Sequence, residues 1–248
     1  MSLRYQSVLL LALLAPMAGA SEPAKSPPEI DPAVLTEGFL VAHPDLRWRS
    51  EGIRTYAQGR HAQALVQLRR AARFADKPAQ AMVAAMYWSG VGVPVDRPLG
   101  YAWMDLASER LYPDFVVFRE RYWALLTASE RTEALQRGRA IYAEYGDRVA
   151  KPRLDRTLER ARREITGSRT GFTGRLEIVP ESGPLAGTGL TLRGDQYYAN
   201  EYWKPELYWQ LQDRIWRAPP RGRVEVGAPQ TRVEAPADGD GPAADPGK

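Results

Sequence analysis

The sequence predicts a mainly α protein, built as a short stack of α-α helix pairs with a small α+β C-terminal extension and a disordered tail. Residues 79–108 hold two short helical patterns on either side of a glycine-rich turn, and a weaker copy precedes them. A pair of short helices cannot bury its apolar face alone, so a repeated pair indicates stacking. The chain becomes rich in glycine after residue 166, and in Pro, Ala, Gly and Asp after residue 226.

The stronger unit spans residues 79–113 and has small residues where two helices must approach closely. Ten positions follow one repeat pattern: Ala79, Val83, Ala84, Tyr87, Gly90, Gly92, Val93, Asp96, Trp103 and Ala107. With these residues the segment resembles the Sel1-like repeat, a relative of the tetratricopeptide repeat, although Gly100 and Ser108 stand where that family prefers Ala. The resemblance implies an α-solenoid scaffold that mediates protein–protein interaction.

The weaker copy is supported by its spacing. Tyr56 and Gly59 precede Tyr87 and Gly90 by 31 residues, and a set of second-helix positions repeats at 36 residues. The offsets of 31 and 36 residues differ because the turns of the two units differ in length. A turn tolerates changes of length better than a helix does. A chance likeness between two Ala-rich helices is the alternative. The second-helix positions are Leu65, Leu68, Ala71 and Ala72, aligned with Tyr101, Met104, Ala107 and Ser108.

The first 45 residues are expected to lie outside the stack. Residues 1–20 have a short basic start, an apolar run and an A-x-A signal, which predicts a secretory signal peptide cleaved after Ala20, with an uncleaved anchor as the alternative. Residues 21–45 are predicted to be a flexible lead, because Pro, Ala and charged residues dominate their first part. Export of a chain without cysteines suits the bacterial periplasm, and no later stretch is long enough to span a membrane.

The helical repeat domain is expected over residues 46–166. Thr127 and Glu130 form a capping box, and Gly146 is a plausible C-terminal cap of the helix that follows. Residues 114–146 would then form a helix pair that closes the stack. The expected helices are 47–58, 61–75, 79–88, 97–110, 114–126, 127–146 and 152–166.

The extension is expected over residues 167–226. Residues 174–178 and 222–226 echo each other, and each reads as a short strand, so the two could pair. Between them, Pro205 suits the first turn of a helix that runs to about Arg217. Residues 227–248 are predicted to be a disordered tail.

The sequence carries no recognisable catalytic pattern. The chain has no cysteine and two histidines, His43 and His61, which are expected to be turn or surface residues and not metal ligands. The turn around Gly90 and Gly92 lacks the Lys and Ser/Thr of a phosphate-binding loop. The chain is therefore expected to be non-enzymatic and to need no cofactor.

Charge gives only a weak indication of a partner. The formal net charge is +4, and residues 152–166 form a basic helical segment. Acidic residues interrupt this segment, so a solvated face is favoured over nucleic-acid binding. Contact with an anionic envelope surface or cell-wall polymer stays open as an intermediate interpretation.

The favoured function is an exported scaffold or adaptor that binds a protein or peptide partner in the bacterial envelope. The candidate contact residues are Tyr56, Trp88 and Trp103 in the repeats and Trp203 and Trp209 downstream, although Tyr56 and Trp103 also stand at packing-like positions. Residues 197–216 are dense in Tyr and Trp, which pack a core more often than they bind. The alternative function is a cell-wall glycan-binding or glycan-cleaving protein that uses this cluster with Asp195, Glu201 or Glu206.

Overall fold

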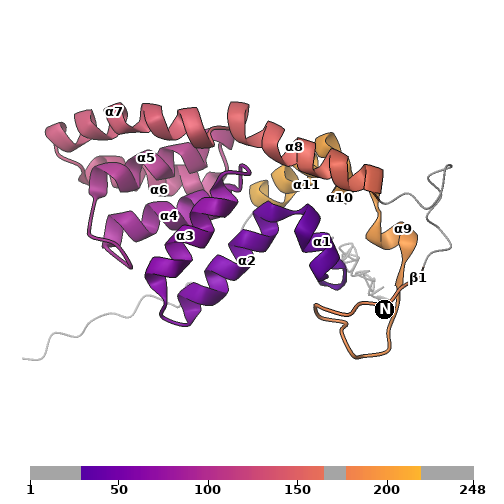
Figure 1. The fold of residues 1–248 in the computed structure, drawn as a ribbon. Coiled ribbons are helices and arrows are strands. Elements are labelled where there is room, and N and C mark those ends of the chain that lie inside the picture. The colour runs from indigo at the N-terminus through magenta and orange to yellow at the C-terminus, as the bar shows by residue number, and fades with distance from the viewer. Residues whose placement is uncertain (1–28, 165–176, 219–248) are drawn as a thin grey trace, which may run out of the picture. The chain divides into compact units, whose positions relative to one another are not determined.

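The computed structural model describes residues 29–164 and 177–218 and is mainly helical (Figure 1). The expected signal peptide, the strand at 222–226 and the tail at 227–248 lie outside these ranges. Within them, no helix combines the length and the apolar character that a membrane span requires.

Two helix pairs form the first part of the fold, as predicted. Helix α2 (Pro44–Ala57) packs on α3 (His61–Ala72), and α4 (Lys77–Ser89) packs on α5 (Arg97–Ala107). Contact between α3 and α4 joins the two pairs into a stack. Gly59 and Gly90, which the sequence aligned, follow α2 and α4 and have φ of 76° and 72°. Both turns thus use the left-handed backbone that glycine adopts without strain.

Two further glycines allow the close approach of neighbouring segments. A Cβ on Gly92 would lie 2.6 Å from the His61 carbonyl carbon, so the second turn packs directly on the start of α3. A Cβ on Gly100 would lie 2.9 Å from the Trp88 backbone nitrogen, where α5 crosses α4. An alanine at position 100 would be crowded there, which explains this departure from the repeat pattern.

The helices that follow do not form the expected pair. The short 3-10 helix η2 (Ser108–Arg110) leads to α6 (Pro113–Leu125), and the predicted capping box starts α7 (Ala128–Tyr145). Helices α6 and α7 both pack mainly on α5 and much less on each other. Arg137 of α7 holds both carboxylate oxygens of Asp96, at 2.9 and 2.8 Å, and Asp96 in turn caps α5. Ala134, Ile141 and Tyr145 of α7 are buried in the same core as α5, and this packing, with the ion pair beside it, holds α7 there.

Helix α8 (Asp147–Glu164) begins five residues earlier than predicted. It leaves α7 and packs against α1 (Glu37–Ala42), α10 (Asn200–Trp203) and α11 (Pro205–Arg217). Its buried residues Leu154 and Leu158 enclose Tyr208 of α11, which has no exposed surface. Helix α8 therefore joins the C-terminal segment to the repeats.

The flexible lead predicted for residues 21–45 is wrong from Pro32 onward. A 3-10 helix, η1 (Pro32–Val34), and α1 precede α2, with Asp31 and Thr36 as their N-terminal caps. Val34 and Phe39 have no exposed surface because aromatic residues from 197–203 cover them. The apolar side chains that order this segment are more than 150 residues away in the sequence, so its own composition could not reveal them.

The C-terminal segment is small and mixed, as predicted, but its strand pairing differs. Strand β1 (Glu177–Ile178) pairs antiparallel with β2 (Leu192–Arg193), with Glu177 opposite Arg193 and Ile178 opposite Leu192. Helices α9 (Gly194–Tyr197), α10 and α11 follow. One core cluster contains residues from both 34–46 and 192–211, so the predicted boundaries at 45 and 166 do not separate independent units.

Candidate interaction surface

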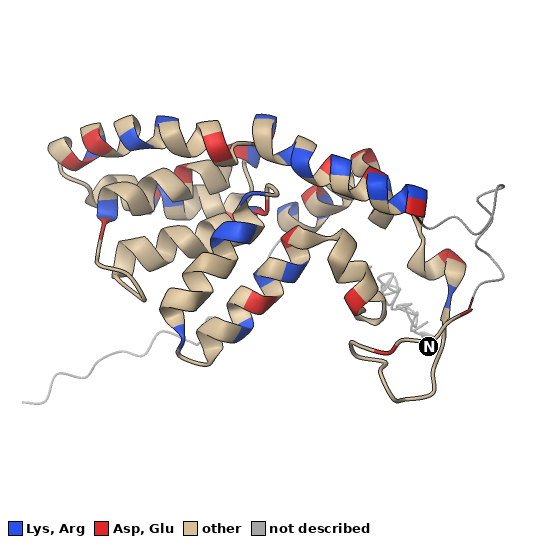
Figure 2. Cartoon of the chain, in the orientation of Figure 1, with Lys and Arg blue, Asp and Glu red and all other residues tan. Residues whose placement is uncertain are grey.

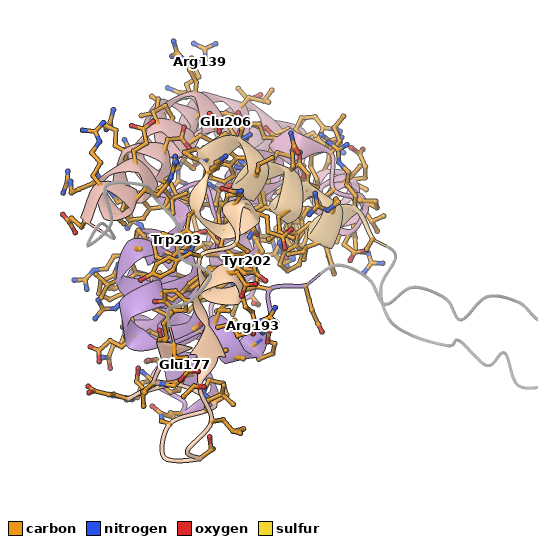
Figure 3. All side chains as sticks on the ribbon, turned by 90° about the vertical axis from the view of Figure 1, so that its right-hand side faces the viewer. Arg139, Glu177, Arg193, Tyr202, Trp203 and Glu206 are labelled. Carbon is orange, nitrogen blue, oxygen red and sulfur yellow. The ribbon has the colours of Figure 1, made fainter. Side chains whose placement is uncertain are left out.

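Two of the five candidate contact residues are buried. Trp103 is 2% exposed in the repeat core, and Trp203 is 5% exposed beneath α1. Trp203 also donates its indole N–H to the Tyr197 carbonyl oxygen at 2.7 Å. Figure 3 shows Tyr202 and Trp203 among the packed side chains and Arg139 projecting outward. Trp103 and Trp203 stabilise the fold and cannot contact a partner while it stays closed.

Trp209 is half-buried, but its ring is already occupied. Its indole N–H donates to Asp155 Oδ1 at 2.8 Å. The Arg110 guanidinium lies 4.7 Å from the ring centroid, and the Lys151 ammonium lies 5.0 Å from it. Cations on an indole ring occupy the surface on which a sugar would stack. Trp209 therefore attaches α11 to α8 and offers little to a glycan.

The three candidate carboxylates do not converge. Asp195 pairs with Arg193 at 3.1 Å, and Glu201 pairs with Arg214 at 3.1 Å. Glu206 lies exposed at the start of α11. General acid–base cleavage of a glycosidic bond requires two carboxyl groups that face one scissile bond. No contact within the described residues brings any two of these three together.

Tyr56 and Trp88 remain partly exposed, near the ends of α2 and α4. The Tyr56 ring lies 4.6 Å from the His61 ring. Trp88 stacks on Tyr122 of α6 at 3.9 Å with an interplanar angle of 8°, and Arg97 lies 5.6 Å from its ring centroid. Trp88 thus bridges α4 and α6 while keeping part of its indole at the surface.

The partly exposed side of α4 is apolar up to Ser89, whose exposed hydroxyl donates to the Ala85 carbonyl oxygen. Its residues lie three or four apart and none is charged, and we call them the α4 face: Pro78, Ala81, Met82, Ala85 and Trp88. Three of them, Ala81, Met82 and Trp88, also touch the repeat core, which holds them in place. Trp88 is the aromatic member of this set and the one predicted as a contact residue from the sequence. The same spacing in a helix with no charged residue after Lys77 would have revealed the rest.

A buried ion network fixes the start of α4. Lys77 Nζ, whose side chain has no exposed surface, lies 2.7 Å from Glu109 Oε2 and 3.0 Å from Asp147 Oδ1. Arg110 pairs with both carboxylate oxygens of Asp147 at 2.7 and 3.0 Å. Burial lowers the pKa of Lys77. Burial also opposes ionisation of Asp147, but Arg110 and Lys77 outweigh it and hold that pKa below its usual value. The network satisfies its own charges, which makes it structural.

Two buried carboxylates lie beside this network. Asp76 caps α4 and pairs with Arg49 at 2.7 Å, and burial raises its pKa to about 6. Asp45 accepts a hydrogen bond from Tyr208, and burial raises its pKa as well. Asp45 and Asp76 line one small cavity, with a volume of about 10 Å³. This space is about enough for one water molecule and is too small for a substrate. Nowhere in the described ranges do three or more His, Asp or Glu residues group to hold a metal ion.

Basic and acidic residues alternate along α7 and α8 (Figure 2). Arg156 and Arg160 of α8 are exposed, but Glu159 and Glu164 accompany them. Arg153 instead donates to the Arg73 and Glu144 carbonyl oxygens at 3.2 and 2.6 Å. This arrangement fits the solvated face that the sequence favoured better than a continuous phosphate-binding ridge.

Comparison with known proteins adds little to this picture. No protein-family model matches the chain, and no curated protein matches it. A solved structure that does match is a protective antigen present in uropathogenic Escherichia coli strains and displaying an SLR fold. The two chains share 22% sequence identity with a TM-score of 0.39, over 50% of this chain and 26% of that one. The match therefore extends over about a quarter of the antigen's length.

Proposed function

We propose that this chain is an exported, non-enzymatic adaptor of the bacterial envelope that binds a protein or peptide partner on the α4 face. The α4 face is the observation that supports this proposal best. It is a row of five apolar, partly exposed residues on a helix of the repeat stack. Uncharged helical surfaces of this kind bind the apolar side of a partner helix or peptide.

The mechanism is display of a preformed surface. Helix α4 packs on α3 and α5, and the buried Lys77 network holds its first turn. A surface that is already ordered loses little conformational entropy when a ligand binds. Ala81, Met82 and Ala85 would supply the contact together with the exposed part of Trp88, because Tyr122 stacks on the Trp88 ring and Arg97 lies 5.6 Å from its centroid.

Location in the periplasm belongs to the same proposal and depends on the signal peptide expected at residues 1–20. An adaptor without cysteines would be unaffected by the oxidising conditions of that compartment. The resemblance of residues 79–113 to the Sel1-like repeat supports a role in protein–protein interaction.

The α4 face can be tested with one exposed alanine. Ala85→Arg places a long charged side chain on the face without altering any buried residue. We expect the parent chain to capture a partner from a periplasmic extract, identified by mass spectrometry, and Ala85→Arg to lose it. The matched control is Ala140→Arg, an exposed alanine on α7, which should retain the partner. Equal capture by both variants would contradict the proposed surface.

The glycan alternative is tested separately by sedimentation with purified cell wall. We expect the parent chain to remain in the supernatant, because Trp203 is buried and Trp209 is covered by cations. Cell-wall retention that Trp209→Ala abolishes, with the fold intact by circular dichroism, would favour the glycan-binding function instead.

A further inference from the structure

We propose that the chain self-associates through α6, with the α6 helix of a second copy packing antiparallel on it. The contact would be the α6 stripe, a set of exposed residues at spacings of three and four: Asp114, Val117, Phe118, Arg121 and Leu125. Val117, Phe118 and Leu125 are 57%, 43% and 60% exposed. This surface lies on a different helix from the α4 face, so the inference goes beyond the proposed function.

Helix α6 is apolar on two sides. Phe115 and Tyr122 are buried in the repeat core, 8% and 7% exposed, and they hold α6 on α5. Phe118, three residues after Phe115, points outward and is 43% exposed. Large apolar side chains gathered on one exposed helical face commonly mark an interaction site.

The α6 stripe is complementary to a second, antiparallel copy of itself. Asp114 and Arg121 lie about one helical turn on either side of the midpoint between Val117 and Phe118. A two-fold axis at that midpoint places Val117 against Phe118 of the second copy. The same axis places Asp114 opposite Arg121 of the second copy, and Arg121 opposite its Asp114. A two-fold interface requires this kind of self-complementary patch.

The charges of the stripe are not used elsewhere in the described part of the chain. Within residues 29–164 and 177–218 no ion pair is found for Asp114 or Arg121. The Arg121 guanidinium lies over the Phe118 ring, 5.6 Å from its centroid. Leu111, two residues before α6 begins, is a further exposed apolar side chain at 69%.

The expected dimer is reversible. One pair of 13-residue helices offers less surface than the roughly 1,200–2,000 Å² of a stable interface. We therefore expect sedimentation velocity to show a monomer–dimer equilibrium that shifts with protein concentration.

Charge reversal tests both the partner and the register. Asp114→Arg places arginines opposite Arg121 of the second copy, and Arg121→Asp places aspartates opposite Asp114, so each variant alone should be monomeric. An equimolar mixture of the two should form heterodimers, because every facing pair then has opposite charges. The double variant Asp114→Arg/Arg121→Asp should dimerise like the parent chain.

Arg139→Asp is the matched control, because Arg139 is an exposed arginine on α7 outside the stripe, and this variant should dimerise normally. Phe118→Lys is a second disrupting variant that changes no buried side chain, and it should be monomeric while unfolding like the parent. A parent chain that is monomeric at every soluble concentration would overturn the inference and would indicate that the stripe binds a different protein. Single reversals that dimerise like the parent, or a mixture that stays monomeric, would also overturn it.

Discussion

Two turn glycines make different demands on the chain. Gly59 and Gly92 both have positive φ, 76° and 74°, but a Cβ on Gly59 would meet nothing within 4 Å. A Cβ on Gly92 would lie 2.6 to 2.7 Å from backbone atoms of His61 and Ala62. Position 59 therefore requires only a permissive backbone, whereas position 92 also requires the absence of a side chain.

Alanine at these positions should separate the two effects. We expect Gly59→Ala to lower the free energy of unfolding by about 1–2 kcal/mol, the cost of a left-handed alanine. Gly92→Ala should cost about 3 kcal/mol or more, because the turn must also move away from α3. Urea unfolding of both variants measures the difference. Equal losses would show that the second turn does not pack on α3 as described.

His43 shows why some residues could not be placed from the sequence. It was expected in a turn or at the surface, and it does join α1 to α2, but it has no exposed surface. Its Nε2 lies 2.8 Å from the Tyr202 carbonyl oxygen, and its ring stacks on Phe39 at 3.9 Å. The Tyr202 contact spans 159 residues, so local composition contains no sign of it.

At the scale of elements, the helices that carry their own end signals were predicted best. The Thr127–Glu130 capping box and Pro205 at the start of α11 appear as expected, and Pro78 likewise lies in the first turn of α4. These signals act within one turn of helix, so the sequence alone displays them. The segment before α2 depends on distant residues and was missed. The pairing of β1 with β2 was also missed, because strands of two residues are too short to show an alternating pattern.

For the candidate contact residues, too, local sequence patterns could be predicted and contacts with distant residues could not. Trp88 lies on a face of α4 that helical spacing could have identified. Trp103 and Trp203 are buried by elements that close over them from elsewhere in the chain. The composition of the aromatic segment could not decide between core and surface, because both uses favour large rings.

Helix α11 is attached to the rest of the fold by polar contacts as well as by packing. Tyr208 donates to Asp45 of α2, and Tyr112, just before α6, donates to Asp213 at 2.6 Å. Asp45 Oδ1 has no hydrogen-bond partner within the described residues. The Tyr208 hydroxyl, which donates to Oδ2, is therefore the main hydrogen-bond donor to the Asp45 carboxyl group. Removal of a donor from a buried acceptor costs more than the net value of the bond, because the acceptor is then left without a partner.

Tyr208→Phe should therefore lower the free energy of unfolding by about 2 kcal/mol, as measured in urea. The matched control is Tyr202→Phe, which also removes a hydroxyl from a buried ring, 6% exposed. The Tyr202 hydroxyl makes only a 3.5 Å contact with the Asp31 backbone nitrogen, so that change should cost less than about 1 kcal/mol. A larger loss for Tyr202→Phe would argue against the described role of Asp45.

For the molecule as a whole, two buried groups should give stability an opposing pH dependence. Burial lowers the pKa of His43 to about 4, although the Tyr202 and Phe39 carbonyl oxygens, each 2.8 Å from a ring nitrogen, favour the protonated ring and oppose this. Unfolded chains bind this proton below about pH 6.5, so acidification from 6.5 to 4 favours unfolding. Asp76 acts in the opposite direction, because its folded pKa of about 6 makes the folded state take up a proton first.

Variants should resolve these opposing effects. We expect His43→Gln to abolish a loss of about 3 kcal/mol between pH 6.5 and 4, although it lowers stability at neutral pH. Asp76→Asn should make the loss on acidification steeper than in the parent chain, because the compensating proton uptake is gone. Urea unfolding across this pH range gives both slopes. A parallel pH profile for His43→Gln and the parent would contradict a buried, neutral histidine.

The shared core of residues 34–46 and 192–211 has a consequence for biosynthesis. Phe39 is synthesised long before Tyr202 and Trp203, so residues 34–46 stay uncovered until residues 192–211 have been synthesised. During that interval we expect the exposed apolar residues of this segment to be accessible to proteases and chaperones. Nascent or prematurely terminated molecules should consequently be degraded faster than completed ones.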